Sequence, residues 1–388
     1  MTVNKNSFIY VSPSLIPSKS ANSVHVIMQC AAIIAEGENL TLFASRSIKD
    51  KSTMQRLILE AYGVDLSSAK IITFFNRIQK LLNLRIALLA LSFLILWDGK
   101  MTVLSRNLYY SFFHAIIFCK PLIFETHQVE KGFRKILQRI VMRCQLVHTI
   151  VISRKLKEIL KEVHGVAPYS TIILPDAAPD GLMPAPISKR SENLYYRLNI
   201  SRKNWYAVCG YFGQLYEGRG IEIIEYMARE RQDVLFVVYG GESYDVSRSK
   251  KKNRDLSNIY FGGHISHPDT QELMRCMDIL LMPYQKKVSI GTKSDDTAKW
   301  MSPMKMFEYM ASGLPIISSD LPVLREVLDD MRNAILVSPT DPQEWCYALD
   351  RLVDNIDLAQ SIGKQAYNDY KEKYTWGVRA RKILDLVN

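Results

Sequence analysis

Strand-like apolar runs alternate with helix-like segments along almost the whole chain, and this alternation limits the fold more than any other feature. The first series begins with a buried-strand pattern at 7–11 and an apolar-periodic helix at 24–36. A second strand follows at 40–44. Strand, helix and strand in this order open a doubly wound parallel sheet. Later strands of this series are predicted at 101–104, 121–124, 148–152 and 171–174.

A second alternating series follows a proline-rich stretch at 175–186, which reads as a linker. Its strands are predicted at 206–211, 234–239, 259–261, 279–282 and 316–318. A chain of 388 residues is long enough for two domains. We therefore expect an α/β protein with two Rossmann-like, doubly wound parallel-sheet domains facing across a cleft.

Charge is distributed unevenly between the two series. Residues 1–175 carry 22 Lys and Arg against 10 Asp and Glu, a net charge of +12, whereas the remainder carries 28 against 29, a net charge of −1. A basic first half favours an anionic partner, either nucleic acid or an anionic membrane. Since no zinc-finger, RRM or helix-turn-helix pattern is evident, we expect no nucleic-acid partner.

The six cysteines are scattered and form no C-x-x-C pair. This pattern favours reduced thiols in a cytoplasmic protein over disulfides or a zinc site. The N-terminus also lacks the basic and then apolar pattern of a signal peptide.

Two segments of the first half bear on membrane contact. The apolar run at 81–97 has only twelve residues between Arg85 and Asp98, too few to span a bilayer, so it predicts a buried or membrane-facing helix. The segment 131–144 predicts an amphipathic helix whose other faces are basic. Its apolar face would consist of Phe133, Ile136, Leu137, Ile140, Val141 and Cys144. Such a helix either lies on an anionic membrane surface or packs on the core with a solvated basic face.

The run from Trp300 to Ile317, WMSPMKMFEYMASGLPII, carries the chemistry of the second half. Ser302 is predicted to cap a helix with Pro303 in its first turn. The unpaired N–H groups of a helix N-terminus attract phosphate. Lys305 and Glu308 are three residues apart and share a helical face. Together they suit a nucleotide diphosphate, with the lysine on the phosphates and the carboxylate on the ribose hydroxyls.

This run resembles the donor-site signature of the retaining glycosyltransferases of family 4, in its Ser-Pro-X-Lys-X-Phe-Glu-Tyr-Met-Ala form. The resemblance implies the two-domain GT-B fold. Its first domain, the acceptor side with possible membrane contact, would be residues 1–178. The donor-binding domain would be 179–368, and a C-terminal helix at 369–388 would return to the first domain.

The resemblance also implies the donor-binding residues. Arg219, in the loop GQLYEGRGI after a strand, would grip the diphosphate together with Lys305. Other donor contacts would come from strand-end loops and from the start of the helix. These are Gly213, Gly240, Gly241, Gly263, His264, Ser302, Pro303, Met304 and Glu308. His264 fits a structural role equally well.

In the first half, the segment IFETH ending at His127 resembles the family's strand-end Glu-X-His. His127 would lie near the donor sugar and complete a catalytic set with Arg219, Lys305 and Glu308. Four further residues are candidates for the acceptor side or for the loop that approaches the donor. They are Lys19, Ser20, Asn22 and Arg106.

Two features concern the sugar and the metal. Many family members carry a first glutamate eight residues before the second, and Trp300 stands at that position here. No Asp-X-Asp motif ends a strand, so we expect no metal and no cofactor beyond the nucleotide-sugar substrate.

The resemblance therefore predicts a retaining glycosyltransferase that moves a sugar from a nucleotide-diphosphate sugar to a lipid-linked or saccharide acceptor, as in polysaccharide assembly. The cysteine pattern predicts a cytoplasmic protein, and the basic half favours a peripheral position on the inner face of the cytoplasmic membrane. A nucleotide-sugar epimerase of the same fold, a catalytically silent nucleotide-binding relative and a nucleic-acid-binding protein remain as alternatives.

Overall fold

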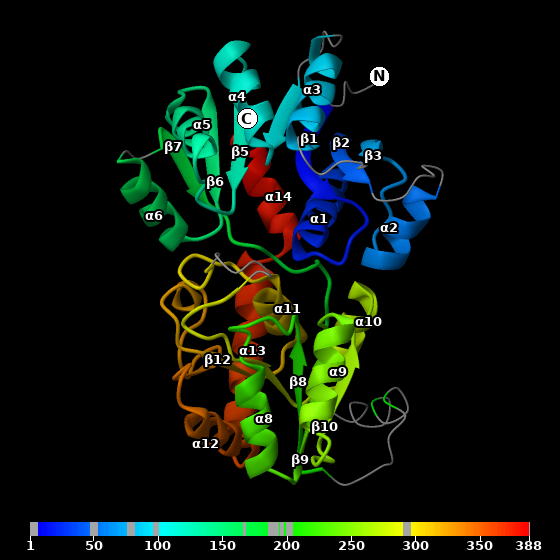
Figure 1. Ribbon diagram of the computed structural model, residues 1–388, viewed down its shortest axis with the longest axis vertical. Helices are drawn as coiled ribbons and strands as arrows, with labels where there is room; N and C mark the ends of the chain where they lie inside the picture. The colour runs from blue at the N-terminus through cyan, green and yellow to red at the C-terminus, as the bar shows by residue number, and fades with distance from the viewer. Residues whose placement is uncertain are drawn as a thin grey trace. The chain divides into compact units, whose positions relative to one another are not determined.

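The computed structural model describes residues 7–46, 53–75, 82–95, 101–165, 168–184, 194, 198, 205–289 and 296–387. The chain forms two compact units (Figure 1). Unit 1 consists of Met1–Asp176 and Trp376–Asn388, and unit 2 of Ala177–Thr375. Each unit is built around one parallel β-sheet.

Unit 1 holds a seven-stranded sheet in the order β3-β2-β1-β4-β5-β6-β7. Its strands are β1 (Ser7–Leu15), β2 (Asn39–Arg46), β3 (Lys70–Phe75), β4 (Met101–Ser105), β5 (Leu122–Thr126), β6 (Val147–Val151) and β7 (Ser170–Ile173). The central strand β1 is apolar on both faces, because helices cover both faces of a parallel sheet. Phe8, Ile9, Tyr10 and Val11 are accordingly buried.

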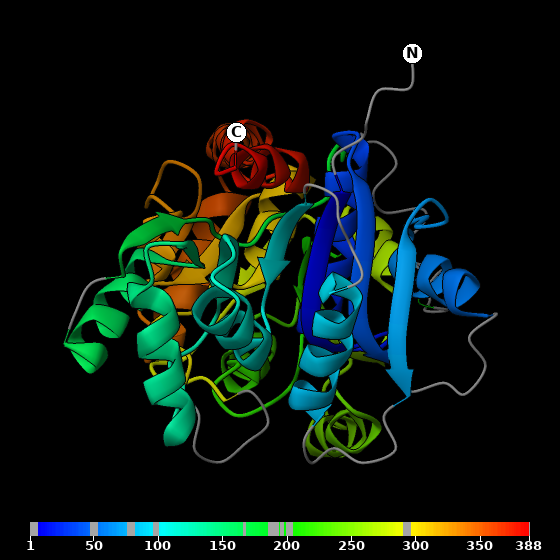
Figure 2. The same ribbon diagram turned by 90° about the horizontal axis from the view of Figure 1, so that it is seen from above.

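The helices of unit 1 lie on both faces of this sheet (Figure 2). They are α1 (Ala21–Ala35), α2 (Met54–Tyr62), α3 (Leu82–Ile95), α4 (Leu108–Phe112), the π-helix η1 (Phe113–Ile117), α5 (Phe133–Arg143), α6 (Arg154–His164) and α14 (Trp376–Leu384). Helix α14, the last of the chain, packs against α1. Unit 1 is therefore completed by a segment that follows all of unit 2 in the sequence.

Unit 2 holds a six-stranded sheet in the order β10-β9-β8-β11-β12-β13. Its strands are β8 (Ala207–Phe212), β9 (Val234–Tyr239), β10 (Ile259–Gly263), β11 (Ile279–Met282), β12 (Ile316–Ser319) and β13 (Ile335–Val337). Its helices are α8 (Ile221–Glu230), α9 (Ser243–Lys252), α10 (His267–Met274), α11 (Met304–Ser312), the 3-10 helix η3 (Leu324–Glu326), α12 (Pro342–Val353) and α13 (Ile356–Lys373).

The strand order reverses direction once in each sheet, between β1 and β4 in unit 1 and between β8 and β11 in unit 2. In open α/β sheets, the loops at the carboxyl ends of the strands diverge at such a switch point and leave room for a ligand. The residues that follow these strands are therefore candidates for a binding site.

The prediction of two parallel-sheet α/β domains is confirmed, and each predicted strand has a counterpart. The helix predicted to start with Ser302 as its cap and Pro303 in its first turn starts slightly later. Helix α11 begins at Met304, and Pro303 is its N-cap, with an extended backbone (ψ 120°). The Met306 N–H bonds to the Pro303 carbonyl, and no side chain caps the helix. Ser302 is buried just outside it.

None of the described helices combines the length and the apolar character needed to cross a membrane. The apolar run at 81–97 forms α3 over its described part and buries Ile86, Ala87, Ala90 and Leu91. All six cysteines lie in the described part of the chain and are free thiols, as predicted.

Candidate active site

The switch point of unit 2 brings two cations together. Strands β8 and β11 are neighbours, so the loop after β8, which carries Arg219, and the segment after β11 share one edge of the sheet. Tyr284 follows β11 at this edge and is buried. The Arg219 guanidinium carbon lies 5.3 Å from the centre of the Tyr284 ring, and Lys305 Nζ lies 4.4 Å from the same centre.

Lys305 is a nearly buried cation held between aromatic rings. Besides Tyr284, its Nζ lies 4.1 Å from the centre of the Tyr211 ring. Burial lowers the pKa of Lys305 well below its ordinary value and the neighbouring Arg219 lowers it further, whereas the Glu308 carboxylate offsets this lowering only in part. The electron-rich ring faces attract the ammonium but supply no countercharge. The arrangement therefore favours an anion at this point.

Arg219 is fixed in place by two hydrogen bonds. Its Nη1 donates to the Tyr284 hydroxyl at 3.1 Å, and its Nη2 donates to the Ser289 carbonyl at 3.2 Å. Its Nε is buried and has no partner among the described residues. A guanidinium that is positioned in advance and still has a donor to spare suits an oxyanion.

Glu308 lies one turn after Lys305 on α11 and is also mostly buried. One of its oxygens, Oε1, is 2.6 Å from His267 Nε2, which donates to it. On its other side, the His267 ring is 3.4 Å from the Gln271 amide. The carboxylate is therefore oriented by a residue from α10, which is the kind of support a ribose-binding group needs.

The glycines predicted near the nucleotide lie in loops at the ends of β8, β9 and β10, and backbone hydrogen bonds join these loops. The Gly213 N–H bonds to the Tyr239 carbonyl, and the Gly240 N–H bonds to the Gly263 carbonyl. At Gly240, where φ is +112°, a Cβ would lie 2.1 Å from the Gly213 carbonyl oxygen. Only glycine allows these two loops to approach so closely.

The remaining predicted donor residues lie around this edge. Gly241 follows Gly240 and packs against the Leu215 side chain. His264 follows β10, and its side chain is exposed. Met304 is the first residue of α11 and is half-buried.

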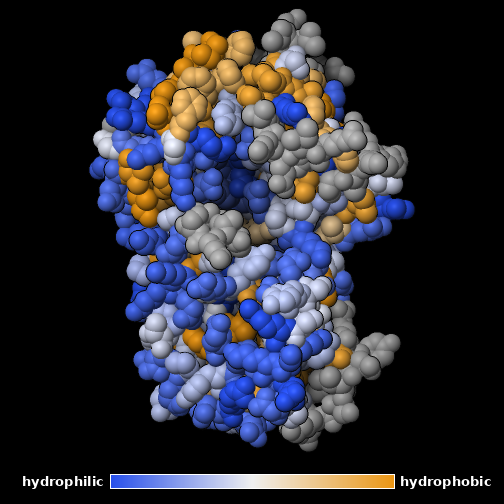
Figure 3. All heavy atoms as spheres, viewed as in Figure 1, coloured by the Kyte–Doolittle hydropathy of each residue, from blue (hydrophilic) through white to orange (hydrophobic). Residues whose placement is uncertain are grey.

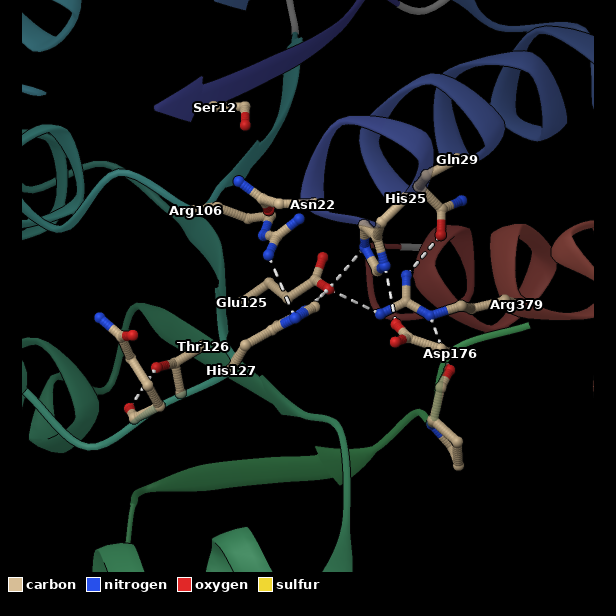
Figure 4. Close-up of polar contacts among 12 residues, drawn as sticks. Ser12, Asn22, His25, Gln29, Arg106, Glu125, Thr126, His127, Asp176 and Arg379 are labelled. Carbon is tan, nitrogen blue, oxygen red and sulfur yellow. Dashed lines mark hydrogen bonds and ion pairs between the residues drawn. The ribbon is translucent and has the colours of Figure 1, made fainter. Parts of the chain in front are cut away.

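Unit 1 contains a second polar cluster, buried where α1, α14 and the ends of the strands meet (Figure 4). Its centre is Glu125, the fourth residue of β5, which is 1% exposed. Glu125 Oε1 lies 2.9 Å from His25 Nε2 and 2.8 Å from Arg379 Nη2. His25 Nδ1 in turn lies 2.8 Å from Asp176 Oδ1. Burial favours the neutral acid, but Arg379 and then His25 outweigh it and hold the pKa of Glu125 well below 4.5.

His127 extends this cluster toward Arg106. Its Nε2 donates to Glu125 Oε1 at 2.6 Å, and Arg106 Nη2 is 3.1 Å from its Nδ1. Burial and the nearby Arg106 lower the pKa of His127 to about 4, so the ring is neutral at pH 7. Both ring nitrogens already have protein partners, Glu125 and Arg106. His127 therefore has no ring nitrogen left for the predicted hydrogen bond to a sugar hydroxyl unless one of these contacts is replaced.

The loop candidates of unit 1 have structural contacts as well. Ser20 is the N-cap of α1, and its hydroxyl accepts a hydrogen bond from the Ser23 N–H. The Asn22 amide donates to the Ser14 hydroxyl at 2.8 Å. Lys19 is exposed.

Several residues of the two clusters were absent from the sequence prediction: Tyr211, Tyr284, His267, His25, Asp176 and Arg379. One of them had a readable signal. Arg379 stands on the same helical face as Trp376, Ala380 and Ile383, all of them buried. A charge on the apolar face of a helix points to a buried ion pair.

Helix α5 differs from the pattern predicted for 131–144. Of the residues placed on one apolar face, Leu137 and Val141 are buried, whereas Phe133, Ile136 and Ile140 are 67%, 55% and 39% exposed. The buried face is completed by Gln138 and Met142, so the helix is rotated relative to its apolar stripe. Exposed cations stand beside this stripe: Lys131, Lys135, Arg139 and Arg143. Hydrophobic side chains gather at this end of unit 1, over α4 and α5 (Figure 3).

Comparison with known proteins gives matches over parts of the sequence and over the whole fold. Residues 207–355 match the family model of the group 1 glycosyl transferases. An uncharacterized glycosyltransferase of Methanocaldococcus jannaschii is 24% identical over 180 residues, which are 45% of this chain and 43% of that protein. The matched stretch thus spans less than half the length of this curated relative.

Two solved structures are similar over nearly their whole length. Anabaena HepE in complex with UDP has a TM-score of 0.72 at 14% identity and covers 98% of this chain and 99% of its own. A glycosyltransferase of Rickettsia africae has a TM-score of 0.76 at 14% identity, covering 99% and 98%. The chain therefore has the GT-B fold, and its second unit carries the stretch that matches the group 1 glycosyl transferases.

Proposed function

We propose that this protein is a retaining glycosyltransferase that transfers a sugar from a nucleotide-diphosphate sugar to an acceptor hydroxyl. The observation that carries the proposal is the pair of cations, Arg219 and Lys305, which lie over the one ring of Tyr284 at the switch point of unit 2. Two neighbouring cations at a largely buried position are suited to a diphosphate.

The chemistry follows from where charge develops. As the bond between the sugar and the phosphate stretches, the sugar becomes oxocarbenium-like and negative charge grows on the leaving diphosphate. Arg219 and Lys305 are already oriented in a desolvated site, so they stabilise that charge without reorganisation. The departing phosphate oxygen takes the proton of the acceptor hydroxyl, whose oxygen attacks the same face of the sugar. Glu308, oriented by His267, would hold the ribose hydroxyls.

The first experiment incubates the full chain with a panel of UDP-, GDP- and other sugar nucleotides and follows nucleotide release, with and without EDTA. HepE has been solved with UDP and with UDP-glucose, so uridine donors are the first to try. We expect release of the nucleoside diphosphate that chelation leaves unchanged. An epimerised sugar nucleotide would instead indicate an epimerase, and binding without turnover would indicate a silent relative.

We further propose that the acceptor is lipid-linked and that unit 1 docks on an anionic membrane through α5. The support is the exposed stripe of Phe133, Ile136 and Ile140 with cations beside it. Such a face inserts apolar side chains at the headgroup boundary while Lys and Arg contact anionic lipids, each worth about 1 kcal/mol near the surface.

This docking predicts flotation with vesicles that contain anionic lipid, weakened by salt. Replacing Phe133, Ile136 and Ile140 together by serine should lower vesicle affinity by about tenfold or more, since each side chain loses burial in the lipid. The control is Leu59→Ser on α2, which removes an apolar residue whose exposure, 51%, lies within the range of the three stripe residues. Equal binding to neutral and anionic vesicles would contradict the docking surface.

A further inference from the structure

The polar cluster of unit 1 holds one cation whose hydrogen bonding is incomplete. Arg106 directly follows β4, at the switch point of the sheet, and its Nη2 contacts His127 Nδ1. Its second terminal nitrogen, Nη1, is buried, and among the described residues no group accepts a hydrogen bond from it. An unsatisfied buried donor on a charged group is costly, so a structure keeps one only where something else satisfies it.

His127 holds this guanidinium in one direction. A neutral imidazole has one N–H, and the 2.6 Å contact to Glu125 places it on Nε2. Nδ1 is therefore an acceptor, and it can only receive the hydrogen bond from Arg106. Glu125 is itself fixed by His25 and Arg379, so the direction of Arg106 is set by a chain of contacts that reaches α14.

We propose that Arg106 is the substrate-binding cation of unit 1, that its ligand is a phosphate oxygen, and that His127 is its positioning residue. Figure 4 shows Arg106 with its guanidinium over His127 and Asn22 beside it. A guanidinium binds oxyanions through two adjacent N–H groups, and the proposed function supplies two phosphate-bearing substrates, the nucleotide donor and a lipid-linked acceptor. The identity of the phosphate thus rests on the proposed function, whereas the oxyanion site itself does not.

The test separates this site from the cations of unit 2. In the full chain carrying Arg219→Ala and Lys305→Ala, inorganic sulfate is titrated by calorimetry, because its charge is constant between pH 5.5 and 8. We expect this variant to bind sulfate, and Arg106→Gln added to it to weaken binding by roughly tenfold or more. No change on adding Arg106→Gln, or no sulfate binding in the parent, would overturn the proposal.

The role of His127 has its own readout in the same background. His127→Asn keeps an acceptor near the position of Nδ1 and should retain most of the sulfate affinity, whereas His127→Phe should lose as much as Arg106→Gln. The sulfate affinity should also be flat between pH 5.5 and 8. An affinity that rises on acidification, or that is lost equally in both His127 variants, would make the imidazole the ligand and refute a positioning role.

Binding of UDP and of sulfate to Arg106→Gln in the otherwise unchanged chain distinguishes the two sources of the phosphate, the nucleotide donor and the acceptor. Weaker binding of UDP would assign the nucleotide donor to Arg106, and unchanged UDP binding with weaker sulfate binding would assign the acceptor. Both results support the site. If the chain turns over no sugar nucleotide and Arg106 still binds sulfate, the proposed function fails and this inference stands.

Discussion

Replacing Lys305 by methionine is expected to remove turnover while leaving the protein at least as stable as before. Lys305 lies in a buried position between two tyrosine rings and beside Arg219. Removing one preorganised donor from a site of developing negative charge costs about 10²–10³-fold in kcat. Methionine fills a similar volume and removes a charge whose burial opposes folding. The rate is measured as nucleotide release and the stability by thermal unfolding.

The pH dependence checks the stability part of this expectation. The pKa of Lys305 is lowered in the folded protein. Between this lowered pKa and the ordinary lysine value of 10.5, the unfolded chain therefore binds more protons than the folded chain does. The stability of the unmodified protein therefore rises in this range, and the advantage of Lys305→Met shrinks as pH approaches 10.5.

The matched control is Lys299→Met, which removes an exposed lysine from the segment before α11. It should change neither the rate nor the stability appreciably. Turnover within threefold of normal in Lys305→Met would remove Lys305, and with it the diphosphate site, from the mechanism.

Replacing Arg379 by methionine is expected to destabilise unit 1 by about 3–5 kcal/mol, because it leaves the buried carboxylate of Glu125 without its main countercharge. Arg379 is 3% exposed and also donates to the Gln29 side chain and to the Pro175 carbonyl. Since the chain has two units and need not unfold in one step, the measurement is amide hydrogen exchange in peptides from α1 and β5.

Two comparisons isolate the charge at this site. Arg381→Met removes an exposed arginine of the same helix, paired with Glu36, and should cost about 1 kcal/mol or less. Adding Glu125→Gln to Arg379→Met should restore part of the lost stability. The difference in the stability of unit 1 between Arg379→Met and the unmodified protein should also become smaller as pH falls below 4.5. The lowered pKa of Glu125 stabilises the unmodified protein only while the carboxylate is ionised, and this stabilisation is lost as it is protonated. Equal effects of the two arginine variants would contradict the argument.

The sheets could be predicted from the sequence because buried parallel strands leave a local signal. A strand covered on both faces is apolar where it is buried, as β8 and β9 are over their whole length and β1 is at Phe8–Val11. The two strands that were not predicted are also mostly apolar, but each is short or only partly covered. Strand β3 is a half-buried edge strand, and β13 has only three residues.

The candidate site was predictable where a motif carries its residues, as for Arg219 in one segment and for Lys305 and Glu308 in another. Lys305 and Glu308 stand one turn apart on α11, so their common face is set by the helix. Tyr284 lies in another segment, and no spacing rule states whose ring will stand beside an ammonium. Likewise, the orientation of α5 depends on which side of the helix the sheet covers, and its predicted apolar face is buried only in part, at Leu137 and Val141.

The late position of α14 in the chain sets an order for folding during synthesis. Glu125 and Arg379 are 254 residues apart, and all of unit 2 lies between them. While the ribosome is still adding residues 177–375, the first sheet carries a carboxylate whose arginine partner has not been made. Unit 2 can then reach its native state first, and a nascent chain arrested before Trp376 should expose an incomplete first domain to chaperones and proteases.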